Sequence, residues 1–70
     1  MTKEMLKKNV AYRNGSSFDR WYYTGKTRQE KRFNCKTLRM EEVTVYIFNG
    51  PFDAVNVGYT EDEIKRFKEV

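Results

Sequence analysis

The clearest alternation of apolar and polar side chains lies in the middle of the chain, at residues 42–48 (EVTVYIF). β-Branched and aromatic residues at a period of two predict a strand here. Both faces of this strand are apolar, so we expect it inside a sheet and not at an edge. Residues 49–53 (NGPFD) have turn chemistry, and residues 54–59 alternate again. A hairpin is therefore predicted across this turn.

A helix is predicted over residues 61–68, directly after Thr60. Thr60 and Glu63 have the spacing of a capping box, in which each side chain accepts the other residue's free backbone N–H. Acidic residues come first and basic residues last, which matches the helix dipole. Ile64 and Phe67, three residues apart, are expected to pack on the sheet, so we predict a structural role for this helix.

The N-terminal half predicts shorter elements. Residues 18–24 and 31–40 have strand character, and the segment TGKTRQE between them is expected to be a hairpin turn with Gly25 at its bend. Residues 10–13 predict another strand, followed by an Asn-Gly pair that favours a type I′ turn. Residues 2–9 are expected to form one or two helical turns. The sum is a single small α+β domain, an antiparallel sheet of about three to five strands with a C-terminal helix.

The letters TGKT at residues 24–27 match the end of a nucleotide-binding phosphate loop. The full motif requires another glycine five positions before Gly25, and that position is Arg20. Bulky aromatic residues fill the positions between them. The motif also belongs to a strand–loop–helix unit of a parallel sheet, larger than this chain can supply. An NTPase is therefore rejected.

The composition excludes several other classes of function. There is no histidine, and Cys35 is the only cysteine, so neither a zinc site nor a Cys–His dyad can form. No catalytic residue, metal or cofactor is expected. Cys35 follows Phe33 closely and is predicted to be a half-buried small residue. No apolar run is long enough for a membrane span, and residues 1–9 lack the apolar segment of a secretory signal, so a cytoplasmic protein is expected.

Positive charge is concentrated in the N-terminal half. Residues 1–40 contain 11 basic and 3 acidic side chains, whereas residues 41–70 contain 3 basic and 7 acidic ones. A basic face attracts polyanions, although a charge run is also common on solvated surfaces. The chain also has 11 aromatic residues, more than so small a core is expected to bury.

The sequence RWYYTGKTRQEKRF at residues 20–33 combines both features. Aromatic rings stack on nucleobases, and neighbouring cations neutralise phosphates. We therefore predict a non-enzymatic binding module for nucleic acid or a nucleotide-like anion. Alternate residues of a strand share a face, so one aromatic set can enter the core while the other stays exposed. The polyanion-binding candidates are Arg20, Tyr22, Lys26, Arg28, Lys31 and Arg32, with Trp21 and Tyr23 as stacking candidates.

Two other interpretations remain open for the same residues. The aromatic side chains can simply fill the core, which leaves the cations solvated. Alternatively, aromatic residues beside arginine can anchor a protein interface. In that case the chain is an inhibitor or adaptor of a larger protein, like the small accessory proteins that viruses encode. The acidic C-terminal half could also pair with the basic half of a second copy in a homodimer.

Overall fold

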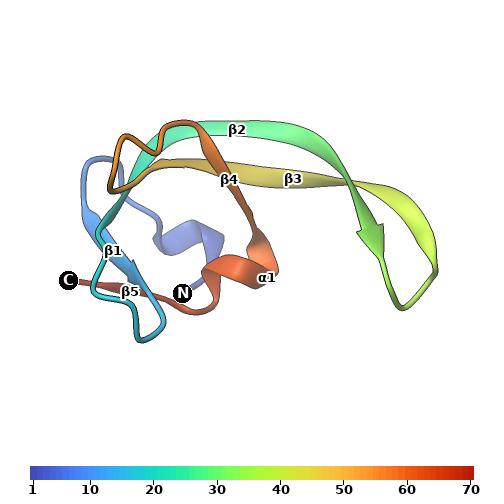
Figure 1. Ribbon diagram of the computed structural model, residues 1–70, viewed down its shortest axis with the longest axis horizontal. Helices are drawn as coiled ribbons and strands as arrows, with labels where there is room; N and C mark the ends of the chain where they lie inside the picture. Colours follow the sequence, from blue (N-terminus) through green and yellow to red (C-terminus); the bar gives the residue numbers. More distant parts are fainter.

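The chain folds into one antiparallel sheet of five strands with a single short α-helix, in a computed structural model that describes all of residues 1–70. The strands lie in the order β4-β3-β2-β1-β5 (Figure 1). The predicted strand at residues 42–48 falls within β3 and has a neighbour on each side. The elements in chain order are η1 (Lys3–Met5), β1 (Ala11–Asn14), β2 (Trp21–Asn34), β3 (Arg39–Asn49), β4 (Val57–Thr60), α1 (Glu61–Ile64) and β5 (Phe67–Glu69).

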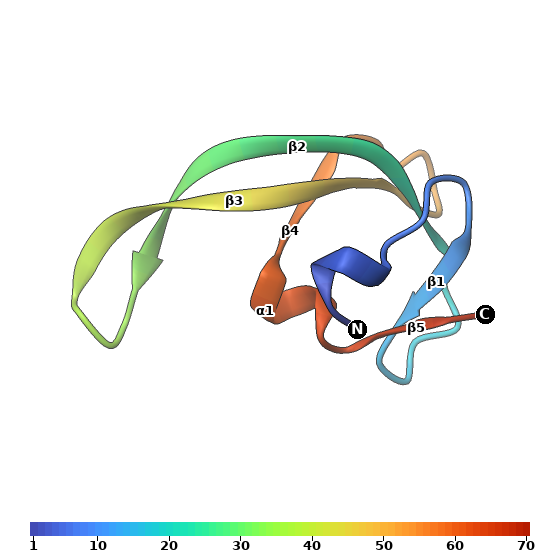
Figure 2. The same ribbon diagram turned by 180° about the vertical axis from the view of Figure 1, so that it is seen from behind.

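The core is a small aromatic cluster enclosed by the curved sheet. Phe48 of β3 lies at its centre, with ring centroids 5.0 Å from Phe67 and 6.5 Å from Tyr12. Ile64 of α1 is fully buried in the same cluster. The N-terminal segment with η1 and the short helix α1 both lie beneath the sheet in Figures 1 and 2. Ile64 and Phe67 are both buried in the core as predicted, but only Ile64 packs there from the helix, because Phe67 belongs to β5.

β3 is apolar on both faces, as its sequence pattern predicts. Val45 and Ile47 point to the face opposite Phe48, and both are buried. Val45 is covered by the backbone of Gly58 on β4, where an added Cβ would lie 2.8 Å from a Val45 methyl carbon. Because Gly58 has no side chain, its backbone can lie close to Val45. This explains how Val45 is buried on the face of the sheet opposite Phe48.

The predicted turn at TGKTRQE is wrong. These residues lie inside β2, which continues without interruption to Asn34 and pairs with β3 as far as Arg39. Gly25 forms a β-bulge instead, with φ at +84°, between the pairs Tyr23–Phe48 and Thr27–Tyr46. A bulge uses the positive φ that glycine permits without reversing the chain. Lys26 follows in the same bulge and no helix follows it, so the phosphate-loop geometry is absent.

The predicted C-terminal helix is shorter than expected. The capping box at Thr60 and Glu63 is present, but α1 ends at Ile64. Residues 67–69 instead form β5, which pairs with β1 from Asn14 to Tyr12. A capping box specifies where a helix begins, but not how far it continues. Here the open edge of β1 supplies backbone partners that replace the later helical hydrogen bonds.

The N-terminal elements agree with the sequence in kind and differ in detail. A single helical turn forms at η1, and the predicted strand at residues 10–13 appears as β1. In the Asn-Gly turn after β1, only Gly15 takes a positive φ, +61°, so this turn is not the predicted type I′. β2 begins only at Trp21, because residues 15–20 form the connection between β1 and β2.

Candidate nucleic-acid interface

The most prominent feature of the surface is a two-stranded ribbon that extends from the body of the sheet (Figure 1). β1 pairs with β2 only at Trp21 and Tyr22, and β4 pairs with β3 only from Val45 to Phe48. Residues 27–44 therefore project as a hairpin without a third strand on either side. We call these residues the arm, and residues 31–40 the arm tip.

The arm tip is closed by a turn that the side chain of Asn34 organises. The Lys36 backbone N–H donates to Asn34 Oδ1 at 2.8 Å, and the Leu38 N–H donates to the Asn34 carbonyl at 2.7 Å. Leu38 takes a left-handed conformation, with φ at +56°. This conformation is unfavourable for a side chain with a Cβ, by roughly 1–2 kcal/mol. The fold therefore holds a large apolar residue where glycine or asparagine is usual.

The arm tip exposes three large apolar side chains. Phe33 and Met40 are cross-strand partners on one face of the ribbon, and each is 59% exposed. Leu38 in the turn is 74% exposed. Exposed apolar side chains scattered singly are ordinary on a protein surface, but three gathered at the end of a ribbon are not. We call Phe33, Leu38 and Met40 the apolar tip cluster.

The same ten residues are strongly basic. Lys31, Arg32, Lys36 and Arg39 lie in the arm tip, and no carboxylate occurs between residues 31 and 40. The side chains of Lys31, Lys36 and Arg39 form no ion pair within the chain, whereas Arg32 does. Three cations therefore remain available beside the apolar tip cluster. Such a combination can neutralise phosphates and contact bases or sugars together.

A network of ion pairs fixes the base of the arm. Arg28 and Arg32 both donate to Glu30 between them, all three on one face of β2. Arg32 also reaches Glu63 of α1 at 3.3 Å and the Gly58 carbonyl at 3.2 Å. Hydrogen bonds from Arg28 and then Arg32 lower the pKa of Glu30 below its ordinary value. The network therefore ties the arm to the capping box of α1.

The structure separates the polyanion-binding residues that the sequence suggested. Arg28 and Arg32 lie together but are engaged by carboxylates, while Lys31 points to the opposite face of the same strand. Lys26 lies in the bulge beside Gly25. Arg20 and Tyr22 lie at the other end of β2, where Tyr22 is 41% exposed. These six residues do not form one continuous patch.

The two stacking candidates are part of the packing. Trp21 is half-buried, with its ring edge-on to Tyr59 at 5.3 Å. Tyr23 is also half-buried and packs against Phe48 and Tyr46, and burial raises the pKa of its hydroxyl. Neither ring is as open to a stacking ligand as Phe33. The interpretation that some of these aromatic residues fill the core holds for this pair.

The candidates predicted from the sequence do not include Lys36, Leu38, Arg39 or Met40, and they include Phe33 only as part of the stretch 20–33. The signal for these residues was the absence of any acidic residue between Glu30 and Glu41. With a hairpin turn predicted at Gly25, these residues are expected in a separate strand and not at the end of a ribbon. Cys35 lies in the true turn and is exposed, so its predicted half-burial is wrong. A loop residue at the end of a ribbon has no neighbouring element to cover it.

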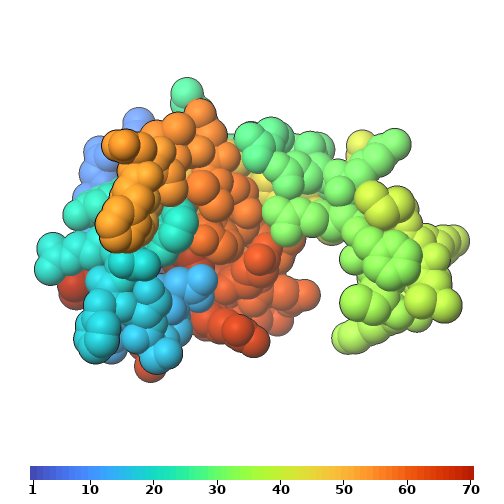
Figure 3. Space-filling view, in the orientation of Figure 1, coloured from blue at the N-terminus to red at the C-terminus, as the bar shows by residue number.

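A shallow hollow lies between the arm tip and α1 in Figure 3. Its volume is about 300 Å³, and it is lined by residues 32–36, Glu41 and Val43 from the arm and Asp62 from α1. Most of these side chains are polar, and the hollow is open to solvent. It separates the arm tip from the body, so the end of the ribbon is accessible from several sides.

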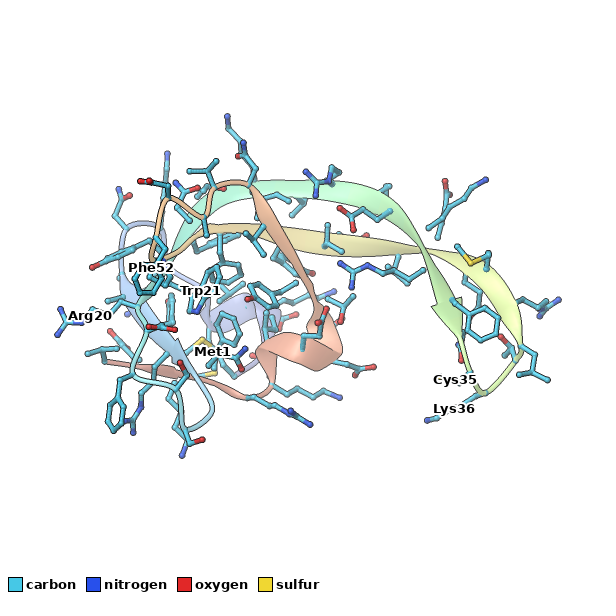
Figure 4. The ribbon with its side chains drawn as sticks, viewed as in Figure 1. Met1, Arg20, Trp21, Cys35, Lys36 and Phe52 are labelled. Atoms are coloured by element: carbon cyan, nitrogen blue, oxygen red, sulfur yellow. The ribbon has the colours of Figure 1, made fainter.

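The opposite end of the molecule carries a second exposed apolar surface. Phe18 is 89% exposed, Phe52 94% and Val55 63%, all from loops. Phe52 has a φ of +54°, and the turn that presents it is held by the Gly50 N–H, which donates to the Ala54 carbonyl at 2.8 Å. Figure 4 shows Phe52 and Arg20 at this end, with Cys35 and Lys36 at the other. We call Phe18, Arg20, Tyr22, Phe52 and Val55 the loop-end surface.

The fold and the arm define a small antiparallel-sheet protein with a projecting basic ribbon. Comparison of the chain with protein-family models, with characterised proteins and with solved structures found no match. No helix in the structure has the length and apolar character needed to cross a membrane. No three cysteine or acidic side chains converge in an arrangement that could hold a metal ion.

Proposed function

We propose that this protein is a non-enzymatic module that binds nucleic acid through its arm. The observation that carries the proposal is the charge of the arm tip, in which residues 31–40 hold four basic and no acidic side chains. Three of these cations form no ion pair within the chain, and they lie toward the end of a ribbon that projects from the body (Figure 1). Lys31 has Glu42 as its cross-strand neighbour, but no ion pair joins them. Cations in such a position meet a polyanion before any other part of the protein does.

The shape of the arm favours a duplex over a free nucleotide. A two-stranded ribbon fits the width of the major groove of double-stranded DNA, and β-ribbon proteins also contact the minor groove. A nucleotide-like anion would require a concave pocket with converging donors, whereas the hollow beside the arm is shallow and includes Glu41 and Asp62. The proposal therefore keeps the polyanion predicted from the sequence and moves the contact from residues 20–32 toward the arm tip.

The remaining basic residues have supporting roles in this proposal. Arg28 and Arg32 hold the arm in place through Glu30 and Glu63. Lys26 lies behind the tip, beside Gly25, over which the side chain of Lys8 packs. These two lysines can approach the phosphate backbone once the tip is engaged. The proposal also places the protein in the cytoplasm, where the exposed Cys35 stays reduced.

Titration of a fluorescently labelled duplex and a single strand tests the proposal. We expect binding at low salt that weakens steeply as salt is raised, because neutralised phosphates release counterions. Lys36→Ala with Arg39→Ala should reduce affinity about tenfold or more. The matched control is Lys3→Ala with Lys68→Ala, two exposed cations on the body, with a small effect expected. Absence of binding to either nucleic acid at low salt would contradict the proposal.

The loop-end surface favours a second candidate, a protein partner. Exposed aromatic residues beside an arginine are the residue types that anchor protein interfaces. Phe52 and Phe18 are almost fully exposed, and Arg20 lies at the same end of the molecule (Figure 4). In this proposal the protein is an inhibitor or adaptor that acts through this surface or as a homodimer. From the sequence, Arg20 and Tyr22 were polyanion-binding candidates, and a protein interface was left open for the same aromatic and arginine residues.

Affinity capture with nuclease treatment separates the two candidates. A partner that is retained after nuclease and at moderate salt, and is lost with Phe18→Ser and Phe52→Ser, supports the protein interface. Sedimentation of the purified chain tests the homodimer directly. A monomer whose captured partners all disappear with nuclease contradicts the second candidate and leaves the first.

A further inference from the structure

We propose that the apolar tip cluster is a wedge that enters the minor groove of duplex DNA, separates two stacked base pairs and bends the duplex. This inference rests on the proposed function, because it concerns the same arm. It adds the kind of ligand and the consequence of binding. Proteins that deform DNA from the minor groove insert apolar side chains between base steps in this manner.

The position of the cluster is the first argument. Phe33 and Met40 lie side by side as cross-strand partners, and both are 59% exposed. Leu38 extends from the turn beyond them and is 74% exposed. Lys31, Lys36 and Arg39 flank the three apolar side chains without ion-pair partners. Phosphates on both sides of a groove can thus be neutralised while the apolar side chains meet the bases.

The conformation of Leu38 is the second argument. It takes a φ of +56°, which glycine or asparagine adopts more easily, and it is absent from the buried core. Folding alone therefore gives no reason for leucine at this position. An unfavourable backbone conformation that presents an exposed apolar side chain is typical of a residue used for contact with a ligand.

Few side chains of the arm are free to read bases. Side chains that read bases in the grooves are Arg, Asn and Gln with free donors and acceptors. Asn34 is occupied by Glu41 and by the Lys36 N–H, and Gln29 donates to Thr44 at 2.6 Å. Arg28 and Arg32 are held by carboxylates. Of the arginine, asparagine and glutamine side chains of the arm, only Arg39 remains, and the free Lys31 and Lys36 act mainly as point charges. We therefore expect binding that depends on deformability of the duplex more than on its sequence.

A duplex labelled at both ends with a donor and an acceptor dye tests the wedge by energy transfer. Bound wild-type protein should shorten the distance between the ends, as a kink of about 20–90° requires. A duplex with a flexible TA step should bind several-fold more tightly than one with a stiff A-tract in its centre. Titrating the same samples by anisotropy gives the affinity independently of the bend.

Two variants remove the wedge and leave the cations. Leu38→Gly relieves the unfavourable φ, so it should fold at least as well as wild type, and Phe33→Ser with Met40→Ser changes only exposed side chains. Both should bind within about tenfold of wild-type affinity but lose most of the bend. The matched control is Val55→Ser, an exposed apolar residue on the loop-end surface, which should bend the duplex like wild type.

The outcomes separate the wedge from the proposed function. Tight, salt-dependent binding with a straight duplex, or a bend unchanged in both wedge variants, would overturn the wedge and leave nucleic-acid binding intact. No duplex binding by the wild-type chain would overturn both and leave the protein partner as the remaining candidate. Loss of the bend in both wedge variants at nearly unchanged affinity would support the wedge.

Discussion

Single residues show where this small fold is tightly packed and where it is not. The core has few fully buried side chains, so each contributes strongly. Tyr12 is completely buried and accepts the Lys7 backbone N–H at 2.7 Å through its hydroxyl. Gly50 lies directly against the Trp21 ring. At the arm tip, by contrast, Leu38 and Phe33 are exposed, so substitutions there test function with little effect on folding.

Tyr12→Phe should destabilise the fold by about 1 kcal/mol. The substitution keeps the ring but leaves the Lys7 N–H without its acceptor, and an unpaired, partly buried donor is unfavourable by this amount. Urea unfolding of both proteins measures the difference. Tyr22→Phe is the matched control, since the Tyr22 ring is 41% exposed and its stability should not change. Equal stability of Tyr12→Phe and wild type would contradict the importance of this hydrogen bond.

Gly50→Ala should destabilise the fold by about 1–3 kcal/mol, because the new Cβ would overlap the six-membered ring of Trp21. The effect should shrink in a Trp21→Phe background, in which the overlapping ring atoms are gone. A double-mutant cycle by thermal unfolding measures this coupling. A Gly50→Ala effect of the same size in both backgrounds would show that the two residues do not interact.

At the scale of elements, the arm and the body depend on each other through one network. Arg32 connects β2 to Glu63, which also accepts the Thr60 N–H at 2.9 Å. The capping box of α1 and the base of the arm therefore share a carboxylate. A change in the charge of this network should alter how firmly the arm is held relative to the body.

The stability that Glu30 contributes should be lost in acid. Its pKa is lowered in the folded chain by Arg28 and Arg32, so its contribution is present above the ordinary carboxyl pKa. It disappears as pH falls below about 4 and through the lowered value. Near pH 7, thermal unfolding should give a higher melting temperature for wild type than for Glu30→Gln. The two melting temperatures should converge toward about pH 3.

Glu42→Gln provides the control for this titration, because Glu42 is an exposed carboxylate of the same arm without an ion pair. It should show a smaller difference from wild type across the same pH range. A Glu30→Gln difference that stays constant from neutral to acid pH would mean that the ion pairs do not stabilise the arm.

Sequence patterns predicted the elements that depend on residues close together in the chain. The strand at β3 alternates clearly, and the capping box at Thr60 identifies the start of α1. The turn of the arm was missed because Gly25 is the stronger turn former, whereas Asn34 makes its turn through a side-chain hydrogen bond. β5 was missed because its pairing with β1 depends on residues far apart in the sequence. In both cases the pairing between strands, and not the local preference of the residues, determines the structure.

The candidate site was predictable in its chemistry and not in its position. The sequence indicated cations and aromatic residues between residues 20 and 33, and β2 does contain them. Only the register with β3 shows that Arg32 faces Glu41 while Lys31 and Phe33 lie on the other face. Ion pairing then removes Arg28 and Arg32 from the free cations. These relationships join distant residues, so no local pattern contains them.

At the scale of the whole molecule, the protein is 35 Å long in its longest dimension. The basic ribbon lies at one end and the exposed aromatic loops at the other (Figure 4). The net charge of +4 is unevenly distributed: residues 31–40 hold four basic and no acidic side chains, and Glu41 and Glu42 follow them in β3. A polyanion should therefore approach the molecule by the arm.

The salt dependence of duplex binding should show, for each cation of the arm tip, whether it contacts a phosphate. Lys36→Ala is expected to reduce the slope of log affinity against log salt by about 1, as for the loss of one phosphate contact. Anisotropy titrations at four or five salt concentrations measure this slope. Lys3→Ala, on the body, should leave it unchanged. Equal slopes for wild type and Lys36→Ala would exclude Lys36 from phosphate contact.

The pairing of β1 with β5 has a consequence for how the chain folds. Asn14 meets Phe67, so the core around Tyr12 can close only after almost the whole sequence has been brought together. Such distant pairings are slow to form, whereas a local hairpin forms within microseconds. The arm needs only its own turn at residues 35–38. We therefore expect the ribbon to form early, so that during folding this chain exposes a basic hairpin before it has a core.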